Sequence, residues 1–101
     1  MFVVVYKYKI PLEKTKDFIN LEKRAIKIYL EYGCTDVQIY RNSNISNRWM
    51  EVNFFKDYET YQQVIEKVDQ DSRMDLLFKA FMELLYVGEP EPEKETFYRI
   101  L

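Results

Sequence analysis

Apolar and polar positions alternate along residues 48–56, and this pattern predicts a β-strand with large side chains on both of its sides. The more apolar side consists of Arg48, Met50, Val52 and Phe54. The side that mixes aromatic and polar groups consists of Trp49, Glu51, Asn53 and Phe55. Buried polar groups need partners, so a strand that only closed a core would rarely carry this second side. We therefore expect the first side to pack on helices and the second to line a mixed cavity.

Similar patterns predict the order strand, helix, strand, strand, helix, strand for the whole chain. Residues 2–10 and 35–41 are rich in β-formers, which predicts the first and second strands. Between them, apolar residues recur at three- and four-residue steps in a helical stripe, and Gly33 follows it where a helix C-cap belongs. Residues 42–47 are a turn-forming run, so the second and third strands are expected to pair as a hairpin.

The second helical region is predicted to form two helices or one bent helix. Asp57 stands where an N-cap belongs, and the apolar stripe that follows it is interrupted at residues 69–71. Ser72 with Asp75 three residues later resembles a capping box in which Asp replaces Glu. A new helical segment is therefore expected to begin there.

The last strand is predicted over residues 96–101, after an acidic connector at residues 88–95. The two prolines of the connector cannot continue a helix, and its Glu-Pro repeat is typical of a stiff spacer. A strand at a sheet edge leaves backbone groups unpaired, so it needs a partner or a shield. A second subunit is the simplest partner.

This βαββαβ order predicts an α+β, ferredoxin-like fold with a four-stranded antiparallel sheet and the helices on one face, built as one domain over residues 1–101. The strand residues expected to face the helices are Val4, Tyr6, Tyr8, Val37, Ile39, Met50, Val52 and Phe54. Those expected on the bare face are Val3, Val5, Lys7, Gln38, Tyr40, Trp49, Glu51, Asn53 and Phe55. The second set is too apolar to face water and too polar for a dry core. Two such sheets are therefore expected to face each other in a homodimer.

Composition and charge exclude several classes of partner. Apolar residues make up 48% of the chain, which is typical of a compact folded protein. The net charge is −2 with both signs interleaved, and the Gly-aromatic-Gly pattern that RNA-recognition domains need on the third strand is absent, so nucleic-acid binding is not expected. Cys34 is the single cysteine, and neither a signal sequence nor an apolar run of about 18 residues is present. These features predict a soluble cytoplasmic protein without a membrane partner.

Six short segments, together with the predicted helix that carries Phe18, resemble a known superfamily. They are residues 9–13 (Lys-Ile-Pro-Leu-Glu), 33–34 (Gly-Cys), 40–41 (Tyr-Arg), 49–51 (Trp-Met-Glu), 55–58 (Phe-Lys-Asp-Tyr) and 71–77. The pattern resembles the dimeric α+β barrel superfamily, and within it the antibiotic-biosynthesis-monooxygenase-like (ABM-like) domains and their uncharacterised relatives. The resemblance covers nearly the whole chain and implies a homodimer.

Within this superfamily, the resemblance implies oxidation of aromatic substrates without metal or flavin, haem degradation, or a small stress or catabolic role. Trp49 matches the third-strand Trp of the oxygenases in type and approximate place. Their first-strand Asn is not matched, because Val5 and Lys7 occupy that region. The haem-degrading branch ligates iron with a His, and this chain contains no His. We therefore expect neither a metal nor a cofactor.

The candidate ligand-binding residues are Lys7, Gln38, Tyr40, Trp49, Glu51 and Asn53. Glu51 is the candidate catalytic residue, because a carboxyl group enclosed by apolar walls is harder to ionise and can act as a general base or acid near neutral pH. The alternative is a structural ion pair of Glu51 with Lys7 or Arg41. Trp49 can stack on a flat substrate or anchor a core or interface. Tyr40 can donate a hydrogen bond to a substrate oxygen or to a backbone carbonyl.

The predicted function is a small homodimer that binds a small aromatic or apolar ligand, with a cofactor-independent monooxygenase as its enzymatic version. The alternative is a non-enzymatic ligand-binding or structural dimer whose inner face is filled by its own side chains. A cavity above roughly 300 Å³ bordered by Trp49 and Glu51 would favour a ligand site. Cys34 is expected to be a buried small hydrophobe. Asp69 and Asp71 are expected to be caps and solvated charges rather than ligands of a cation.

Overall fold

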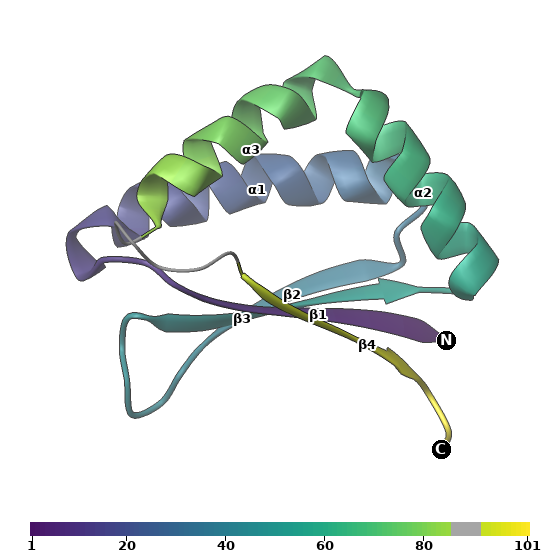
Figure 1. The fold of residues 1–101 in the computed structure, drawn as a ribbon, viewed down its shortest axis with the longest axis horizontal. Coiled ribbons are helices and arrows are strands. Elements are labelled where there is room, and N and C mark those ends of the chain that lie inside the picture. The colour runs from purple at the N-terminus through teal and green to yellow at the C-terminus, as the bar shows by residue number, and fades with distance from the viewer. Residues whose placement is uncertain (86–91) are drawn as a thin grey trace.

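A computed structural model describes residues 1–85 and 92–101, and its four strands form one antiparallel sheet with every described helix on one face (Figure 1). The strands are β1 (Phe2–Lys9), β2 (Asp36–Arg41), β3 (Arg48–Phe55) and β4 (Glu93–Tyr98). Their spatial order is β2-β3-β1-β4, and all three pairings are antiparallel. The predicted α+β, ferredoxin-like fold is confirmed.

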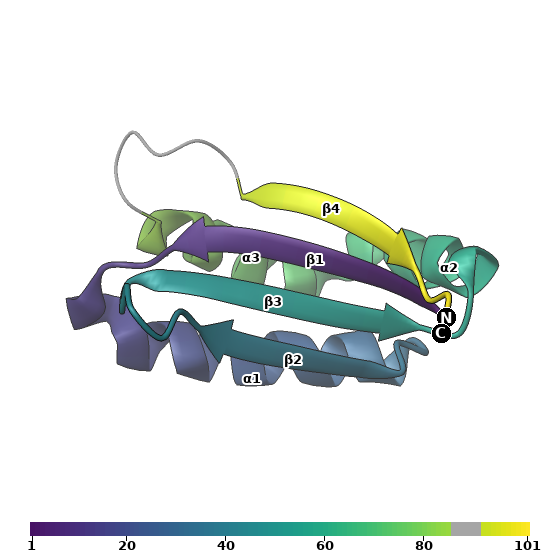
Figure 2. The same cartoon turned by 90° about the horizontal axis from the view of Figure 1, so that it is seen from below.

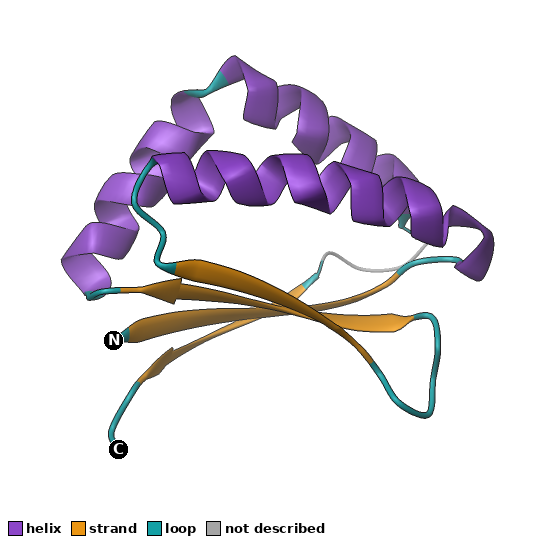
Figure 3. Cartoon of the chain, turned by 180° about the vertical axis from the view of Figure 1, so that it is seen from behind, coloured by secondary structure: helices purple, strands orange, loops and turns teal. Residues whose placement is uncertain are grey.

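Three α-helices cover the sheet, and Figure 3 shows them as one layer above the strands. They are α1 (Thr15–Glu31), α2 (Tyr58–Gln70) and α3 (Ser72–Leu84), and a short 3-10 turn (Leu12–Lys14) precedes α1. None of the described helices is long and apolar enough to span a bilayer. The second helical region is thus two helices, which is one of the two predicted forms.

Side-chain caps and a glycine set the ends of these helices. Asp57 caps α2 as predicted, since its Oδ1 accepts a hydrogen bond from the backbone N–H of Thr60 at 2.7 Å. The capping box predicted to start at Ser72 is wrong, because Asp71 is the N-cap of α3 and accepts from the backbone N–H of Arg73 at 2.8 Å. Gly33 follows α1 with a φ of +112°, in the region that favours glycine, and lets the chain turn into β2.

The last strand, β4, begins and ends earlier than the predicted residues 96–101. The first half of the predicted connector, residues 88–91, lies outside the described residues. Among the described strands, β4 pairs only with β1 and lies at the sheet edge, and its side chains are exposed. The outer edge of β4 therefore has unpaired backbone groups, which need a partner strand or a shield.

The register of β3 shows that the two faces predicted for this strand are exchanged. Tyr6 lies opposite Glu51, and Tyr8 lies opposite Trp49. Residues directly opposite in a sheet point to the same face, so the side of β3 that contains Glu51 and Trp49 faces the helices. Met50, on the other side, is directly opposite Lys7 and lies on the bare face. The sheet has apolar residues on both faces, so hydrophobicity alone could not assign β3, whereas the faces predicted for β1 and β2 are correct.

Two apolar clusters fill the space between sheet and helices. The first is built on Phe2, Val4, Cys34, Val37, Phe55, Val64 and Val68. The second is built on Tyr8, Ile10, Phe18, Trp49 and Leu85. Tyr6 and Ile39 pack against both clusters, and both lie directly opposite Glu51 in the sheet. Glu51 therefore sits in the middle of the covered face, where the two clusters meet.

Candidate ligand-binding site

A cavity of about 380 Å³ lies between the sheet and the helices α1 and α3. Its wall on α3 is formed by Met74, Leu77, Phe78, Phe81 and Met82. The aromatic residues on its other sides are Tyr6, Tyr8 and Tyr29, and its charged residues are Glu22, Glu51 and Lys94. The volume falls within the range of about 300–1,000 Å³ that is typical of small-molecule sites. The cavity is thus apolar over most of its wall, with a few polar groups.

The helical repeat of α1 brings Glu22 to this cavity. Phe18, Glu22 and Ala25 are spaced by four and three residues and share the buried face of the helix. Glu22 is 8% exposed, although glutamate is seldom buried without a partner. Its position in an apolar stripe is a sequence signal that the prediction of the site missed.

Glu51 forms hydrogen bonds with three neighbouring side chains. The Tyr8 hydroxyl donates to Glu51 Oε1 at 3.3 Å, and the Asn53 side chain also hydrogen-bonds to Glu51. The Glu22 and Glu51 carboxyl groups share a further hydrogen bond. An ionised carboxylate is only an acceptor, so one member of this pair carries a proton.

Burial determines which groups of the site are charged. The pKa of Glu22 is raised to about 9, mostly by burial and to a smaller extent by the charge of Glu51 and the hydrogen bond that the two carboxyl groups share. Burial also raises the pKa of Glu51, while the hydrogen bonds from Asn53, Tyr8 and Glu22 oppose this rise. Near neutral pH, Glu22 is therefore protonated and donates to Glu51. This arrangement can exchange a proton with a bound molecule, or bind a group that replaces the shared proton.

Burial also keeps the phenols of the cavity neutral. It is the largest cause of the raised pKa of Tyr6, Tyr8 and Tyr29, and the nearby Glu51 carboxyl adds to each rise. These three hydroxyl groups therefore stay protonated well above neutral pH.

Neither ion pair considered for Glu51 is formed. Lys7 lies on the bare face, opposite Met50, and so on the far side of the sheet from Glu51. Arg41 is on the covered face but stacks near Trp49, with its guanidinium carbon 5.8 Å from the ring centroid. Within residues 1–85 and 92–101, the ion pairs involve Arg73 instead.

The sheet divides the six residues predicted for the site into two groups. Lys7, Gln38 and Tyr40 lie on the bare face, where the Tyr40 hydroxyl donates to Gln38 Oε1. Trp49, Glu51 and Asn53 lie on the covered face, and of the six only Glu51 lines the cavity. The cavity of about 380 Å³ is bordered by Glu51 but not by Trp49, and it lies on the covered face of the sheet, not on the bare face where a cavity was expected.

Trp49 and Asn53 support the site from within the core. The Trp49 ring packs against Phe18 with 4.9 Å between ring centroids, and Trp49 is 8% exposed. Asn53 is 1% exposed and lies opposite Val4 and Val37 in the sheet. Asn53 orients Glu51 by its hydrogen bond, and Trp49 acts as a core anchor.

Cys34 has the character expected for a buried, unreactive thiol. Its Sγ donates to the carbonyl oxygens of Asp36 at 3.3 Å and Phe54 at 3.2 Å. Burial raises the pKa of the Cys34 thiol to about 11, although these two hydrogen bonds oppose the rise. Little thiolate is present near neutral pH, so the residue is structural.

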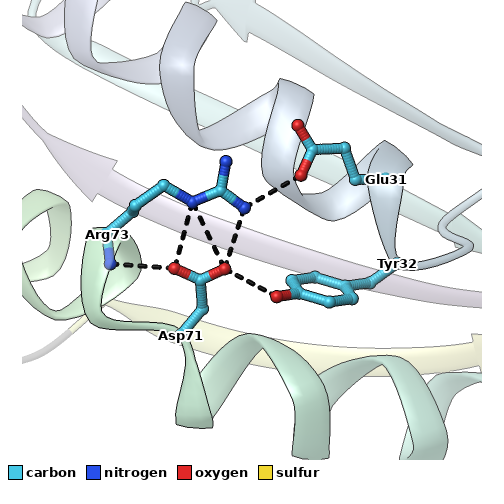
Figure 4. A network of polar contacts seen from close by, with 4 residues as sticks. All are labelled: Glu31, Tyr32, Asp71 and Arg73. Atoms are coloured by element: carbon cyan, nitrogen blue, oxygen red, sulfur yellow. Dashed lines mark hydrogen bonds and ion pairs between the residues drawn. The ribbon is translucent and has the colours of Figure 1, made fainter.

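Asp71 joins three helices through a polar network at the α2–α3 junction (Figure 4). It accepts hydrogen bonds from the Tyr32 hydroxyl at 2.6 Å and from Arg73 Nη2 at 2.8 Å, and Arg73 also pairs with Glu31 at 2.8 Å. The Arg73 and Tyr32 hydrogen bonds hold the pKa of Asp71 well below its usual range. Asp71 is therefore a cap and a cross-link, and no cluster of three or more metal-ligating residues occurs among the described residues.

Solved structures share this fold at low sequence identity. A conserved protein from Methanosarcina mazei Go1 is 24% identical, with a TM-score of 0.78 over 98% of this chain and 92% of that chain. A mutant of SnoaB, a cofactor-independent oxygenase from Streptomyces nogalater, is 11% identical, with a TM-score of 0.77 over 97% and 91% of the two chains. A candidate antibiotic biosynthesis monooxygenase from Nitrosomonas europaea is 12% identical, with a TM-score of 0.78 over 100% of both chains.

These similarities confirm the resemblance to ABM-like proteins at the level of the fold. An uncharacterised NIPSNAP domain protein from Burkholderia xenovorans has the same fold, at 16% identity and a TM-score of 0.77 over 99% of this chain and 95% of that chain. Neither the family models nor the curated protein sequences match this chain. The function must therefore be argued from the residues of the cavity.

Proposed function

We propose that this chain is an ABM-like protein that binds a small aromatic or apolar molecule in the cavity between its sheet and the helices α1 and α3. The observation that carries the proposal is the cavity of about 380 Å³ with aromatic and aliphatic walls and a carboxyl pair. The wall favours an apolar body by burial of apolar surface, and the carboxyl pair can fix its orientation by hydrogen bonds. The alternative of a non-enzymatic dimer whose inner sheet face is filled by its own side chains concerns the bare face of the sheet, and it stays a prediction.

A cavity-filling variant tests this proposal. Ala25 is 7% exposed and lines the cavity, so Ala25→Phe is expected to occupy its volume. Ala80 is half-buried on α3 but does not line the cavity, so Ala80→Phe is the matched control. With 1-naphthylmethanol as probe, calorimetry is expected to show binding to the unmodified protein and to Ala80→Phe, and at least about tenfold weaker binding to Ala25→Phe. Equal binding by both variants, or by neither, would contradict the proposal.

A cofactor-independent monooxygenase is the enzymatic version of the proposal. The observation that favours it is the shared fold with SnoaB, a cofactor-independent oxygenase. In this version Glu51 accepts the proton of a phenolic hydroxyl group, and O₂ oxidises the resulting electron-rich anion: one oxygen atom replaces a ring hydrogen to give a quinone, and the other leaves as water. Oxygen uptake with a panel of reduced quinones is expected to fall in Glu51→Gln and, through loss of the core anchor, in Trp49→Phe. Unchanged turnover in both variants would reject these roles.

We further propose that the protein is a homodimer formed through the bare face of the sheet, which Figure 2 shows free of helices. The apolar residues on this face are Val3, Val5, Met50, Val52, Phe54 and Phe97. Lys7 lies beside Glu93 on the same face, so the patch contains charges of both signs. A two-fold axis brings identical patches together, which buries these apolar residues against each other.

The oligomeric state tests the dimer. Sedimentation of the unmodified protein at micromolar concentration is expected to give the mass of two chains. Val5→Lys is expected to give monomers, because it places a charge in the apolar patch. Ile45→Lys, in the exposed loop between β2 and β3, is expected to leave the dimer intact. A monomeric unmodified protein would reject the dimer. A cytoplasmic location stays a prediction, which cell fractionation checks.

A further inference from the structure

The carboxyl pair of the cavity has no cationic partner among the described residues. Glu22 is nine-tenths buried, lines the cavity, and forms no hydrogen bond with any described residue except Glu51. Lys94 is the one basic residue on the described wall, and its Nζ donates to the Tyr61 hydroxyl at 2.9 Å. The same Nζ lies 5.9 Å from the centroid of the Tyr6 ring. No described basic residue therefore pairs with the acidic groups of the cavity.

A ligand with an ammonium group complements such a pair. Buried carboxylates require a counter-charge or a proton, and here a shared proton takes that place. An ammonium group has three N–H donors, while two ionised carboxylates offer four oxygen acceptors. An ammonium held between Glu22 and Glu51 therefore replaces the shared proton, supplies the counter-charge and forms charge-assisted hydrogen bonds.

The remaining wall suits a cation with an apolar body. Tyr6, Tyr8 and Tyr29 line the cavity together with the carboxyl pair. The face of an aromatic ring carries negative electrostatic potential and attracts an ammonium group. Leu77 and Phe81 on α3 offer apolar surface to the body of the ligand. A ligand that carries a carboxylate would instead meet two acidic groups.

We propose that this cavity is a binding site for small apolar amines, held as ammonium ions between Glu22 and Glu51 against the tyrosine rings. The inference rests on the proposed function in one respect, because it requires that the cavity holds a ligand. The amine arrives as R–NH₃⁺, the proton shared by the carboxyl pair leaves to solvent, and the bound site contains two carboxylates and one ammonium. No covalent bond to carbon forms or breaks.

Three probes that share one ring and differ in one group test this proposal. They are 1-naphthylmethylamine, 1-naphthylmethanol and 1-naphthoic acid, titrated by calorimetry at pH 7 in two buffers of different ionisation enthalpy. The amine is expected to bind at least about tenfold more tightly than the alcohol, the acid most weakly, and about one proton is released with the amine. The phenols of Tyr6, Tyr8 and Tyr29 have raised pKa values and do not supply that proton.

Replacing each glutamate of the pair by glutamine, which has nearly the same shape, tests whether the carboxyl pair causes the preference for the amine probe. In Glu22→Gln and in Glu51→Gln, the affinity for the amine is expected to fall at least about tenfold, and by a much larger factor than the affinity for the alcohol, because glutamine keeps hydrogen-bonding groups but loses the charge. Glu66→Gln, on the exposed side of α2, is expected to bind all three probes as the unmodified protein does. Circular dichroism checks that each variant is folded. If one variant does not fold, the probe series on the unmodified protein still decides the outcome.

The results separate this inference from the proposed function. Any one of three results would overturn the amine site. The alcohol binds as tightly as the amine, the preference for the amine survives in both Gln variants, or the amine binds without proton release. If all three probes bind equally and Ala25→Phe blocks them, the cavity is a ligand site without selectivity for amines. If no probe binds, both proposals fail.

Discussion

Glu22 on α1 and Glu51 on β3 share a hydrogen bond at the cavity, although both residues are acidic. Such a contact requires a proton between the two carboxyl groups, and burial favours the protonated form of Glu22. The contact also joins a helix to the middle strand pair of the sheet. The packing of α1 on the sheet is therefore expected to depend on pH.

Replacing Glu22 by Gln is expected to stabilise the protein at alkaline pH. The pKa of Glu22 is about 9 in the folded state, whereas a glutamate in an unfolded chain has a pKa of about 4.3. Between these values the folded state binds more protons than the unfolded state, so the free energy of unfolding falls as pH rises. The variant lacks this loss and is expected to melt several degrees above the unmodified protein at pH 9 and close to it at pH 5.

Thermal unfolding at pH 5, 7 and 9 measures this difference. Glu51 has a raised pKa as well, so some decline toward pH 9 is expected to remain in Glu22→Gln. Glu66→Gln is the control and is expected to follow the unmodified protein at all three values. If the melting temperatures of Glu22→Gln and the unmodified protein change in parallel with pH, Glu22 is ionised in the folded state.

Replacing Tyr8 by Phe is expected to raise the pKa of Glu51. The hydroxyl of Tyr8 donates to Glu51 Oε1 at 3.3 Å, and this hydrogen bond stabilises the charged carboxylate. A Phe ring keeps the edge-to-face contacts of Tyr8 with Phe18 and Phe81, at 5.7 and 5.0 Å between centroids. Carboxyl carbon NMR titration of Glu51 is the measurement. Tyr40→Phe, on the bare face, is expected to leave the pKa of Glu51 unchanged.

Cys34 is expected to react slowly with a disulfide reagent in the folded protein. With a pKa of about 11, the thiol is ionised on the order of 0.1% at pH 8, and it is 5% exposed. Labelling with Ellman's reagent is expected to be at least about a hundredfold slower than in denaturant. A Cys34→Ser protein that carries Ser46→Cys in the exposed loop provides the control and is expected to react at the rate of an unfolded thiol. Equally fast labelling of Cys34 would show that this part of the core opens readily.

Replacing Asp71 by Asn is expected to lower the melting temperature by several degrees at pH 7. Asn keeps the cap but loses the negative charge that pairs with Arg73. The pKa of Asp71 is depressed in the folded state, so the stabilisation is present above the unfolded pKa of about 3.9 and is lost as pH falls below it. Melting curves from pH 7 to pH 2 are expected to converge toward the acid end. Asp69→Asn is the control, and an equal loss in both variants would contradict a role for the Asp71 network.

The order of elements could be predicted from local signals. The Asp57 cap and the positive φ of Gly33 depend on neighbouring residues alone, so the sequence indicates these helix ends directly. The end of β4 could not be placed in the same way, because its bounds follow from pairing with β1. Local propensity gives the type of an element, whereas its partner strand determines its length.

The faces of β3 could not be predicted, because both sides of this strand carry large apolar residues. Val52 is 8% exposed although it lies on the face that no helix covers. Register decides the question, since Tyr6 is opposite Glu51, and register is a long-range property. Glu22 was missed for a related reason. One glutamate in a helical stripe does not reveal that a second carboxyl from a strand lies against it.

The two ends of α3 are held by different kinds of contact. At its start, Asp71 and Arg73 tie it to Tyr32 and Glu31 through short charged contacts. Near its end, the contact with Lys14 is an exposed hydrogen bond from Nζ to the Glu83 carbonyl at 3.2 Å. Phe81 and Leu84 near the same end also pack against the apolar cluster that contains Tyr8 and Trp49. The first turn of α3 is thus held by charged contacts and its last turns by apolar packing, so added salt weakens the attachment of the first turn much more than that of the last.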